Sequence, residues 1–194
     1  SYIIEDDYDS EFRYIGKPIP ALLALNKDAN VIYMSTFSKS LMPSLRVAYF
    51  VLPKSLLSTY KETFSYYSAT VPRFEQHILA RFMQEGHFSK HLNRMRKTYR
   101  KKHDKLLEIF QSHYPQVEIF GQLAGMHICI SFESKYSEKQ LLERLIDSNI
   151  RIQPLSSYSY HLEPRKPTFI LGFGGIPFEQ IENAVHSLMR VFRT

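Results

Sequence analysis

Four side chains in the first quarter of the chain carry groups that can do chemistry together: Asp6, Tyr8, Lys39 and Arg46. Asp6 and Tyr8 are two positions apart in IIEDDY, a stretch typical of a β-strand, and side chains two apart in a strand project from the same face. Lys39 and Arg46 lie between two short runs typical of strands, VIYMS and RVAYFVL. A carboxylate and a phenol would thus be combined with an amine and a guanidinium from a later strand–loop–strand segment.

This set of groups is what a protein needs to hold pyridoxal phosphate. A carboxylate such as Asp6 near the pyridine nitrogen keeps that nitrogen protonated, which makes the ring an electron sink. The phenol of Tyr8 can hydrogen-bond the deprotonated 3-hydroxyl of the ring. Lys39 supplies a primary amine for a Schiff base with the aldehyde. Arg46 supplies a planar fork of donors that matches phosphate oxygens.

Two hydroxyl residues close to Lys39, Thr36 and Ser38, can add hydrogen bonds to the phosphate. The residues alone leave two alternatives open. If the register of the first strand shifts by one residue, Asp7 replaces Asp6 as the carboxylate. Lys39 by itself could also be a solvated surface charge, as most lysines are.

The composition bounds the class of protein. With 194 residues, 44% of them hydrophobic, the chain can bury a core and form one or two domains. The single cysteine, Cys129, cannot form an internal disulfide, and we expect it to be a buried strand residue. His127 shares a strand face with Cys129. Because these two potential metal ligands have no third beside them, we expect no metal site there. No run of about 18 apolar residues is present and the first residues are acidic, so we expect a cytoplasmic chain without a membrane span.

The formal net charge is +6, and the densest basic run is RMRKTYRKKHDK at 94–105. Such a run can bind a phosphate backbone. The same stretch also carries apolar residues at helical spacing, so we favour an amphipathic helix whose basic side is solvated. The apolar stripe consists of Phe88, Leu92, Met95, Tyr99, Leu106 and Phe110.

The pattern along the chain predicts an α/β part joined by a long helix to an α+β part. Ser137 and Gln140 match a capping box, Pro177 suits the first turn of the last helix, and one helical turn fits the loop 15–30. We expect His87, His91, His103 and His113 on helix surfaces. Strands are expected within residues 1–8, 31–35, 46–52, 126–132, 150–155 and 168–173. Helices are expected at 54–67, from Pro72 to about 114 with a break near Gly86, after Ser137, and after Pro177.

Four motifs in order, EDDYDSEFRY, STFSKSLMPSLRVAYF, HLNRMRKTYRKKHDKL and GQLAGMHICISF, resemble the aminotransferase-like domain of MocR-type regulators of the GntR family. The resemblance implies the α/β fold of type I pyridoxal-phosphate enzymes, as in aspartate aminotransferase. It implies that residues 1–72 are the C-terminal part of the large cofactor-binding domain, and that residues 73–194 are an interdomain helix and the small α+β domain. Carried over by motif, the resemblance gives Lys39, Asp6, Tyr8, Arg46 and Thr36 the roles stated above.

What the resemblance implies about function is more specific. The domain would form an internal aldimine on Lys39, sense an amine or amino acid, and dimerise. It would reach DNA only through an N-terminal winged-helix domain, which this chain lacks. The chain would then be a C-terminal fragment that binds pyridoxal phosphate poorly and exposes a sheet edge that favours self-association. Two alternatives are a true aminotransferase, and a domain with a decayed cofactor site that only dimerises.

One position departs from the pattern of related aminotransferases. Those proteins often carry an arginine for the substrate carboxylate in a motif like RLGF near the C-terminal strand, whereas this chain reads FILGFGG, with Ile170 at that place. Arg151 and Arg165 are candidate substitutes. The identity of the effector therefore stays open.

Overall fold

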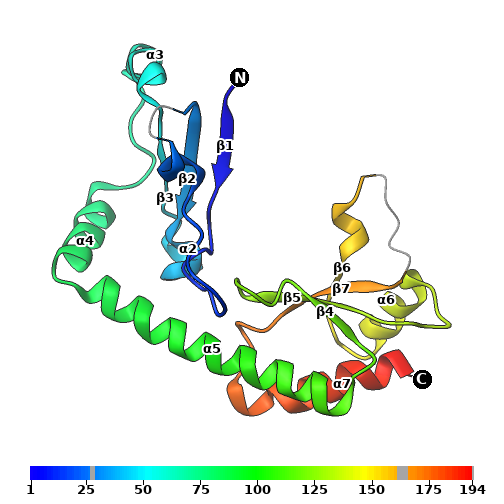
Figure 1. The fold of residues 1–194 in the computed structure, drawn as a ribbon. Coiled ribbons are helices and arrows are strands. Elements are labelled where there is room, and N and C mark those ends of the chain that lie inside the picture. The colour runs from blue at the N-terminus through cyan, green and yellow to red at the C-terminus, as the bar shows by residue number, and fades with distance from the viewer. Residues whose placement is uncertain (27–28, 161–165, 194) are drawn as a thin grey trace. The chain divides into compact units, whose positions relative to one another are not determined.

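The computed structural model describes residues 1–26, 29–160 and 166–193. By its packing the chain divides into two compact units, which Figure 1 shows as ribbons. Unit 1 comprises residues 1–11 and 16–95, and unit 2 comprises residues 12–15 and 96–193 of the described chain. The long helix α5 (His87–His113) begins in unit 1 and ends in unit 2. This division concerns packing, and the domain boundary expected after residue 72 stays a prediction.

Unit 1 is built on a three-stranded sheet of order β1-β2-β3. β1 and β2 are parallel, with Asp6 beside Met34, and β2 and β3 are antiparallel, with Thr36 beside Ala48. All four residues of β3 are exposed. The elements of unit 1 are β1 (Ile3–Asp6), α1 (Leu22–Leu25), β2 (Val31–Thr36), α2 (Phe37–Ser40), the 3-10 turn η1 (Pro43–Leu45), β3 (Ala48–Val51), α3 (Lys54–Phe64), α4 (Arg73–Gln84) and the first part of α5.

Unit 2 holds most of the apolar core. Its sheet is antiparallel, of order β4-β5-β7-β6, and α6 and α7 pack on each other beside it (Figure 1). Side chains from this sheet and these helices, such as Ile130, Phe169, Leu141 and Ile181, are fully buried. The elements of unit 2 are the rest of α5, β4 (Glu118–Phe120), β5 (His127–Ser131), α6 (Glu138–Asp147), β6 (Gln153–Pro154), η2 (Leu155–Tyr158), β7 (Thr168–Gly172), η3 (Phe178–Gln180) and α7 (Ile181–Arg193).

Most of the expected elements are present. The helical region after Pro72 breaks at Gly86, whose φ of 75° is a left-handed conformation that glycine adopts without steric cost. Ser137 and Gln140 form the predicted capping box. The basic side of α5 is largely exposed while Leu92, Leu106 and Phe110 are buried, which confirms the amphipathic helix.

Several expectations were wrong in detail. β1 ends at Asp6, β4 was not predicted, and Pro177 precedes the turn η3 instead of lying in the first turn of α7. Cys129 is half-buried, because its face of β5 is covered at Ser131 but exposed at His127. His103 is buried instead of lying on a helix surface, since α5 is covered on that side by residues 12–15. No helix among the described residues is long and apolar enough to cross a membrane.

Candidate functional site

The predicted site residues of unit 1 gather at the sheet edge where β1 and β2 end. Because these strands are parallel, their carboxyl ends lie side by side, and the N–H of Asp7 still donates to the carbonyl oxygen of Met34 at 2.9 Å. β3 is antiparallel and begins at the same edge, opposite Thr36. The backbone therefore brings Asp6, Thr36 and the loop before β3 together at this edge, a place where α/β folds commonly bind ligands.

Lys39 lies in a single helical turn, α2, directly after β2. Thr36 caps this turn, because its hydroxyl oxygen accepts a hydrogen bond from the N–H of Ser38 at 3.1 Å. The Thr36 hydroxyl also has two acceptors within reach, Ser38 Oγ at 3.0 Å and the carbonyl oxygen of Val47 at 3.1 Å, and it has one proton to donate. In this structure Thr36 shapes the Lys39 turn, and its contact with a phosphate stays a prediction.

Arg46 lies in the loop that leads from α2 to β3. It follows the turn η1 and adopts the left-handed conformation, with φ 51° and ψ 34°, which is uncommon for a residue with a side chain. The next residue, Val47, accepts a hydrogen bond from the N–H of Phe37 at 3.0 Å. This bond holds the Arg46 loop against the start of the Lys39 turn.

The charged groups at this edge are available to a ligand. Asp6, Lys39 and Arg46 are exposed, and within the described part of the chain their side chains have no hydrogen-bond or ion-pair partner. Two cations and one carboxylate suit a ligand that carries a phosphate and a basic ring nitrogen. The donor set therefore fits pyridoxal phosphate.

The neighbouring carboxylate, Asp7, is engaged elsewhere. Its Oδ2 accepts a hydrogen bond from the hydroxyl of Tyr33 at 2.9 Å. Burial, and then this carboxylate, raise the pKa of Tyr33 above its ordinary value, so Tyr33 remains a donor. Between the two, the Asp6 carboxylate has no side-chain partner in the described part of the chain, which favours Asp6 over Asp7. Tyr8 lies two residues beyond the end of β1 and is 43% exposed, so strand alternation does not place it beside Asp6.

Contacts from α5 support the Lys39 turn, and no local sequence pattern indicated them. His91 is half-buried instead of lying on the helix surface, because its Nε2 is 3.1 Å from the carbonyl oxygen of Ser40, at the end of α2. The ring of Phe37, the first residue of α2, also packs edge-on against that of Phe88 in α5, with a centroid distance of 6.0 Å. Partners about fifty positions apart leave no signal in local patterns.

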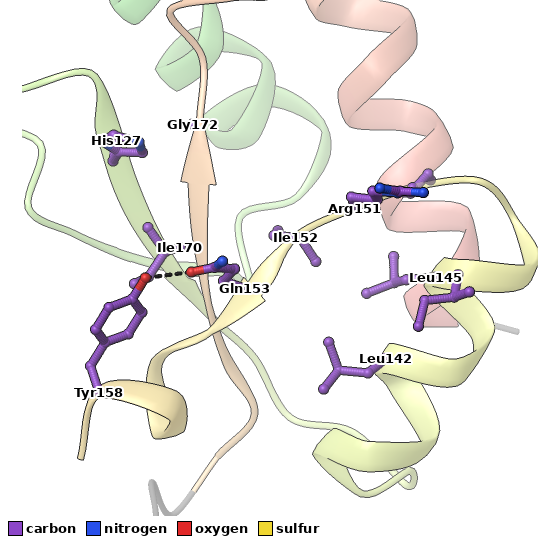
Figure 2. Close-up of a pocket in the computed structure, with 11 residues that line it drawn as sticks. His127, Leu142, Leu145, Arg151, Ile152, Gln153, Tyr158, Ile170 and Gly172 are labelled. Carbon is purple, nitrogen blue, oxygen red and sulfur yellow. Dashed lines mark hydrogen bonds between the residues drawn. The ribbon is translucent and has the colours of Figure 1, made fainter. Parts of the chain in front are cut away.

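A hollow of about 670 Å³ lies in unit 2 and is lined by residues of α6, β6, η2 and β7, among others. Figure 2 shows Ile170 and Tyr158 on one side of it and Arg151 on another, with the Tyr158 hydroxyl donating to the side-chain oxygen of Gln153. Ile170, at the position where we looked for a carboxylate-binding arginine, thus lines this cavity. Arg151, one of the two candidate substitutes, lines the same cavity. The other candidate, Arg165, lies outside the described residues.

Known proteins resemble this chain along its whole length. The sequence profile described as aminotransferase class I and II matches residues 8–188. The chain is 43% identical over 195 residues to the uncharacterized HTH-type transcriptional regulator YdeL of Bacillus subtilis, in an alignment that covers 100% of this chain and 42% of YdeL. It is 34% identical over 193 residues to the probable rhizopine catabolism regulatory protein MocR of Rhizobium meliloti, covering 99% of this chain and 39% of that protein.

Solved structures show the same fold. The α-aminoadipate aminotransferase LysN of Thermus thermophilus, complexed with N-(5'-phosphopyridoxyl)-L-leucine, has a TM-score of 0.82 and 26% identity to this chain, and the match covers 99% of this chain and 50% of LysN. The chain spans less than half the length of the curated relatives named above.

Proposed function

The chain belongs to the aminotransferase class I and II family, and on this premise we propose that it is the effector-sensing and dimerising domain of a MocR-type transcriptional regulator. Its fold is the α/β fold of type I pyridoxal-phosphate enzymes, and its relatives include HTH-type regulators, as the motifs predicted. The similarity to these regulators along the whole chain supports a sensor more than an independent enzyme.

The proposal rests on one observation: the side chains of Lys39, Asp6 and Arg46, at the edge where β1 and β2 end, have no hydrogen-bond or ion-pair partner among the described residues. When bound, pyridoxal phosphate would supply an aldehyde that reacts with amines and a ring that draws electrons. Lys39 would hold it covalently through its amine, and Asp6 would hold a proton at the pyridine nitrogen. Arg46 would hold the phosphate with its planar fork, in the loop that Val47 fixes.

Three further groups would complete the site. Tyr8 would hydrogen-bond the 3-hydroxyl of the ring. Ser38 and Thr36 would add hydrogen bonds to the phosphate, for which the Thr36 hydroxyl must exchange one of its present acceptors. Of these three residues, Thr36 has the additional role of capping the Lys39 turn.

The effector would be an amine or an amino acid, because Lys39 is itself a primary amine and is the group that such a ligand would replace. Release of Lys39 removes one covalent link to α2 and can favour a different arrangement of the two domains, provided that the ligand binds the two arrangements unequally. We place the domain boundary after residue 72. We further propose a cytoplasmic homodimer that contacts DNA through an N-terminal winged-helix domain.

A specific observation favours a second candidate function, a true aminotransferase: LysN and other structures with the same fold are aminotransferases. In that case Lys39, once released by the substrate, would move the proton at the substrate Cα. Release of a keto acid from an amino acid, measured on the purified protein with pyridoxal phosphate, would support the enzyme. Binding of the amino acid without release of a keto acid would support the sensor.

Covalent labelling tests the cofactor proposal. The full-length parent protein is purified, mixed with pyridoxal phosphate, reduced with borohydride and mapped by peptide mass spectrometry, next to its Lys39→Ala variant and the control Lys61→Ala. Lys61 is an exposed lysine of α3 in the same unit. We expect label on Lys39 in the original protein and in the control, and none in Lys39→Ala. Label scattered over surface lysines, or label that survives in Lys39→Ala, would refute the proposal.

A further inference from the structure

Three potential metal ligands meet in unit 2, whereas the proposed cofactor site lies in unit 1. His113 is the last residue of α5, and Glu182 and His186 lie in α7. One ligand atom of each residue lies within 4.8 Å of those of the other two. His113 and Glu182 are exposed and His186 is half-buried, so an ion could reach the cluster from solvent.

The helices bring these groups together by simple geometry. Glu182 and His186 are four positions apart and so lie on the same side of α7, with Glu182 Oε1 3.9 Å from His186 Nε2. The end of α5 adds His113, whose ring lies edge-on to that of His186 with a centroid distance of 5.1 Å.

A neighbouring tyrosine orients His186. The hydroxyl of Tyr114, a buried residue, lies 2.6 Å from His186 Nδ1, and the guanidinium of Arg193 lies 4.8 Å from the Tyr114 ring centroid. In the tautomer with the proton on Nδ1, His186 donates to the tyrosine oxygen, and Nε2 keeps its lone pair toward Glu182. Metal-binding histidines are commonly held through their second nitrogen in this way.

We propose that His113, Glu182 and His186 bind a divalent transition-metal cation, with Zn²⁺ as the representative ion. Two imidazoles and one carboxylate suit Zn²⁺ and not Mg²⁺, which prefers oxygen ligands. Ligand atoms about 2.0–2.2 Å from one tetrahedral ion lie about 3.4 Å from each other. Side-chain rotation on the surface must therefore bring the present atoms closer together. Water would occupy the fourth position.

The ammonium group of Lys105 should weaken metal binding at this cluster. Lys105 Nζ lies 3.8 Å from Glu182 Oε2, the carboxylate oxygen that does not face His186. Its positive charge weakens the attraction of the site for a second cation. Replacement of Lys105 by a neutral residue of similar length should therefore tighten metal binding, whereas loss of a ligand should weaken it.

Zinc competition with a chromogenic chelator tests the site, on tag-free protein from which metals have been removed. We expect one Zn²⁺ per chain, and the variants His113→Asn and His186→Asn should each weaken binding by roughly tenfold or more. Lys105→Gln should tighten it, and Mg²⁺ should not compete. The control is His87→Asn, because His87 lies 3.3 Å from Glu85 but belongs to no cluster of three such ligands among the described residues.

Unfolding curves of each variant show whether weaker zinc binding comes from the loss of a metal-binding side chain or from unfolding of the protein. His113→Asn is the decisive variant, since His113 lies at a helix end and is exposed. Zinc binding that is absent, or that survives unchanged in folded His113→Asn and His186→Asn, would overturn the proposal. Local sequence patterns predicted no metal site, because His113 and Glu182 are distant in the chain.

Discussion

His91 donates a hydrogen bond from Nε2 to the carbonyl oxygen of Ser40, at 3.1 Å, and so fastens the end of the Lys39 turn to α5. The direction of this bond follows from the other ring nitrogen. Arg94 Nη2 lies 3.3 Å from His91 Nδ1, and since a guanidinium can only donate, Nδ1 accepts and Nε2 carries the proton. The position of the candidate cofactor lysine thus depends on a residue fifty-one positions away from Ser40.

Replacement of His91 by leucine should therefore impair the Lys39 turn. Loss of this hydrogen bond should lower the free energy of unfolding by about 0.5–1.5 kcal/mol, and the turn should hold Lys39 less firmly. Denaturant unfolding and the yield of the borohydride label on Lys39 measure the two effects. His87→Leu serves as the control, since His87 is an exposed histidine of the same helix. An unchanged label yield would show that the bond does not position Lys39.

Arg46→Gly should separate stability from cofactor binding. Glycine adopts the left-handed conformation of this position at no steric cost, so the free energy of unfolding should stay the same or rise by up to about 1 kcal/mol. Loss of the guanidinium should nevertheless weaken pyridoxal phosphate binding, followed by absorbance of the bound cofactor. Arg46→Lys should retain only part of the cofactor affinity, because an ammonium group lacks the planar fork of donors with which a guanidinium binds phosphate. If Arg46→Gly bound the cofactor normally, Arg46 would not be its phosphate ligand.

His103→Phe should destabilise unit 2. The side chain of His103 is 1% exposed, stacks on Tyr14 with a centroid distance of 4.4 Å, and has Nε2 2.8 Å from the carbonyl oxygen of Gln122. Phenylalanine keeps the stacking but removes the donor, which should cost about 1–3 kcal/mol in thermal or denaturant unfolding. The comparison is Asp104→Asn, since Asp104 is largely exposed and its contact with His103 Nδ1 should be worth little. Equal stability of His103→Phe and the original protein would contradict the prediction.

The thiol of Cys129 should react slowly at neutral pH. Burial raises its pKa, because it disfavours the charged thiolate, which is the reactive form. Alkylation by iodoacetamide should therefore be slower than that of a free thiol at pH 7, and the midpoint of its pH profile should lie above the ordinary cysteine value. The same reaction in denaturant provides the reference. A midpoint at or below that reference would show that the fold does not disfavour the thiolate.

Local patterns determined much of this protein. The residue types and the spacing of apolar residues predicted β1, β2 and β3, the broken helix around Gly86, and the capping box at Ser137. These features depend on neighbours within a few positions. The motifs around Asp6 and Lys39 indicated the family that the comparisons identify. The roles of the individual site residues stay predictions.

Only the tertiary structure decided how distant segments meet. The parallel pairing of β1 and β2 brings Asp6 to the edge that carries Lys39, and the Tyr33–Asp7 hydrogen bond leaves Asp6 as the available carboxylate. Contacts across many positions also buried His103, fastened the Lys39 turn to His91, and assembled His113 with His186. The burial and partners of a side chain are set by elements far along the chain, so its own neighbours in the sequence carry no record of them.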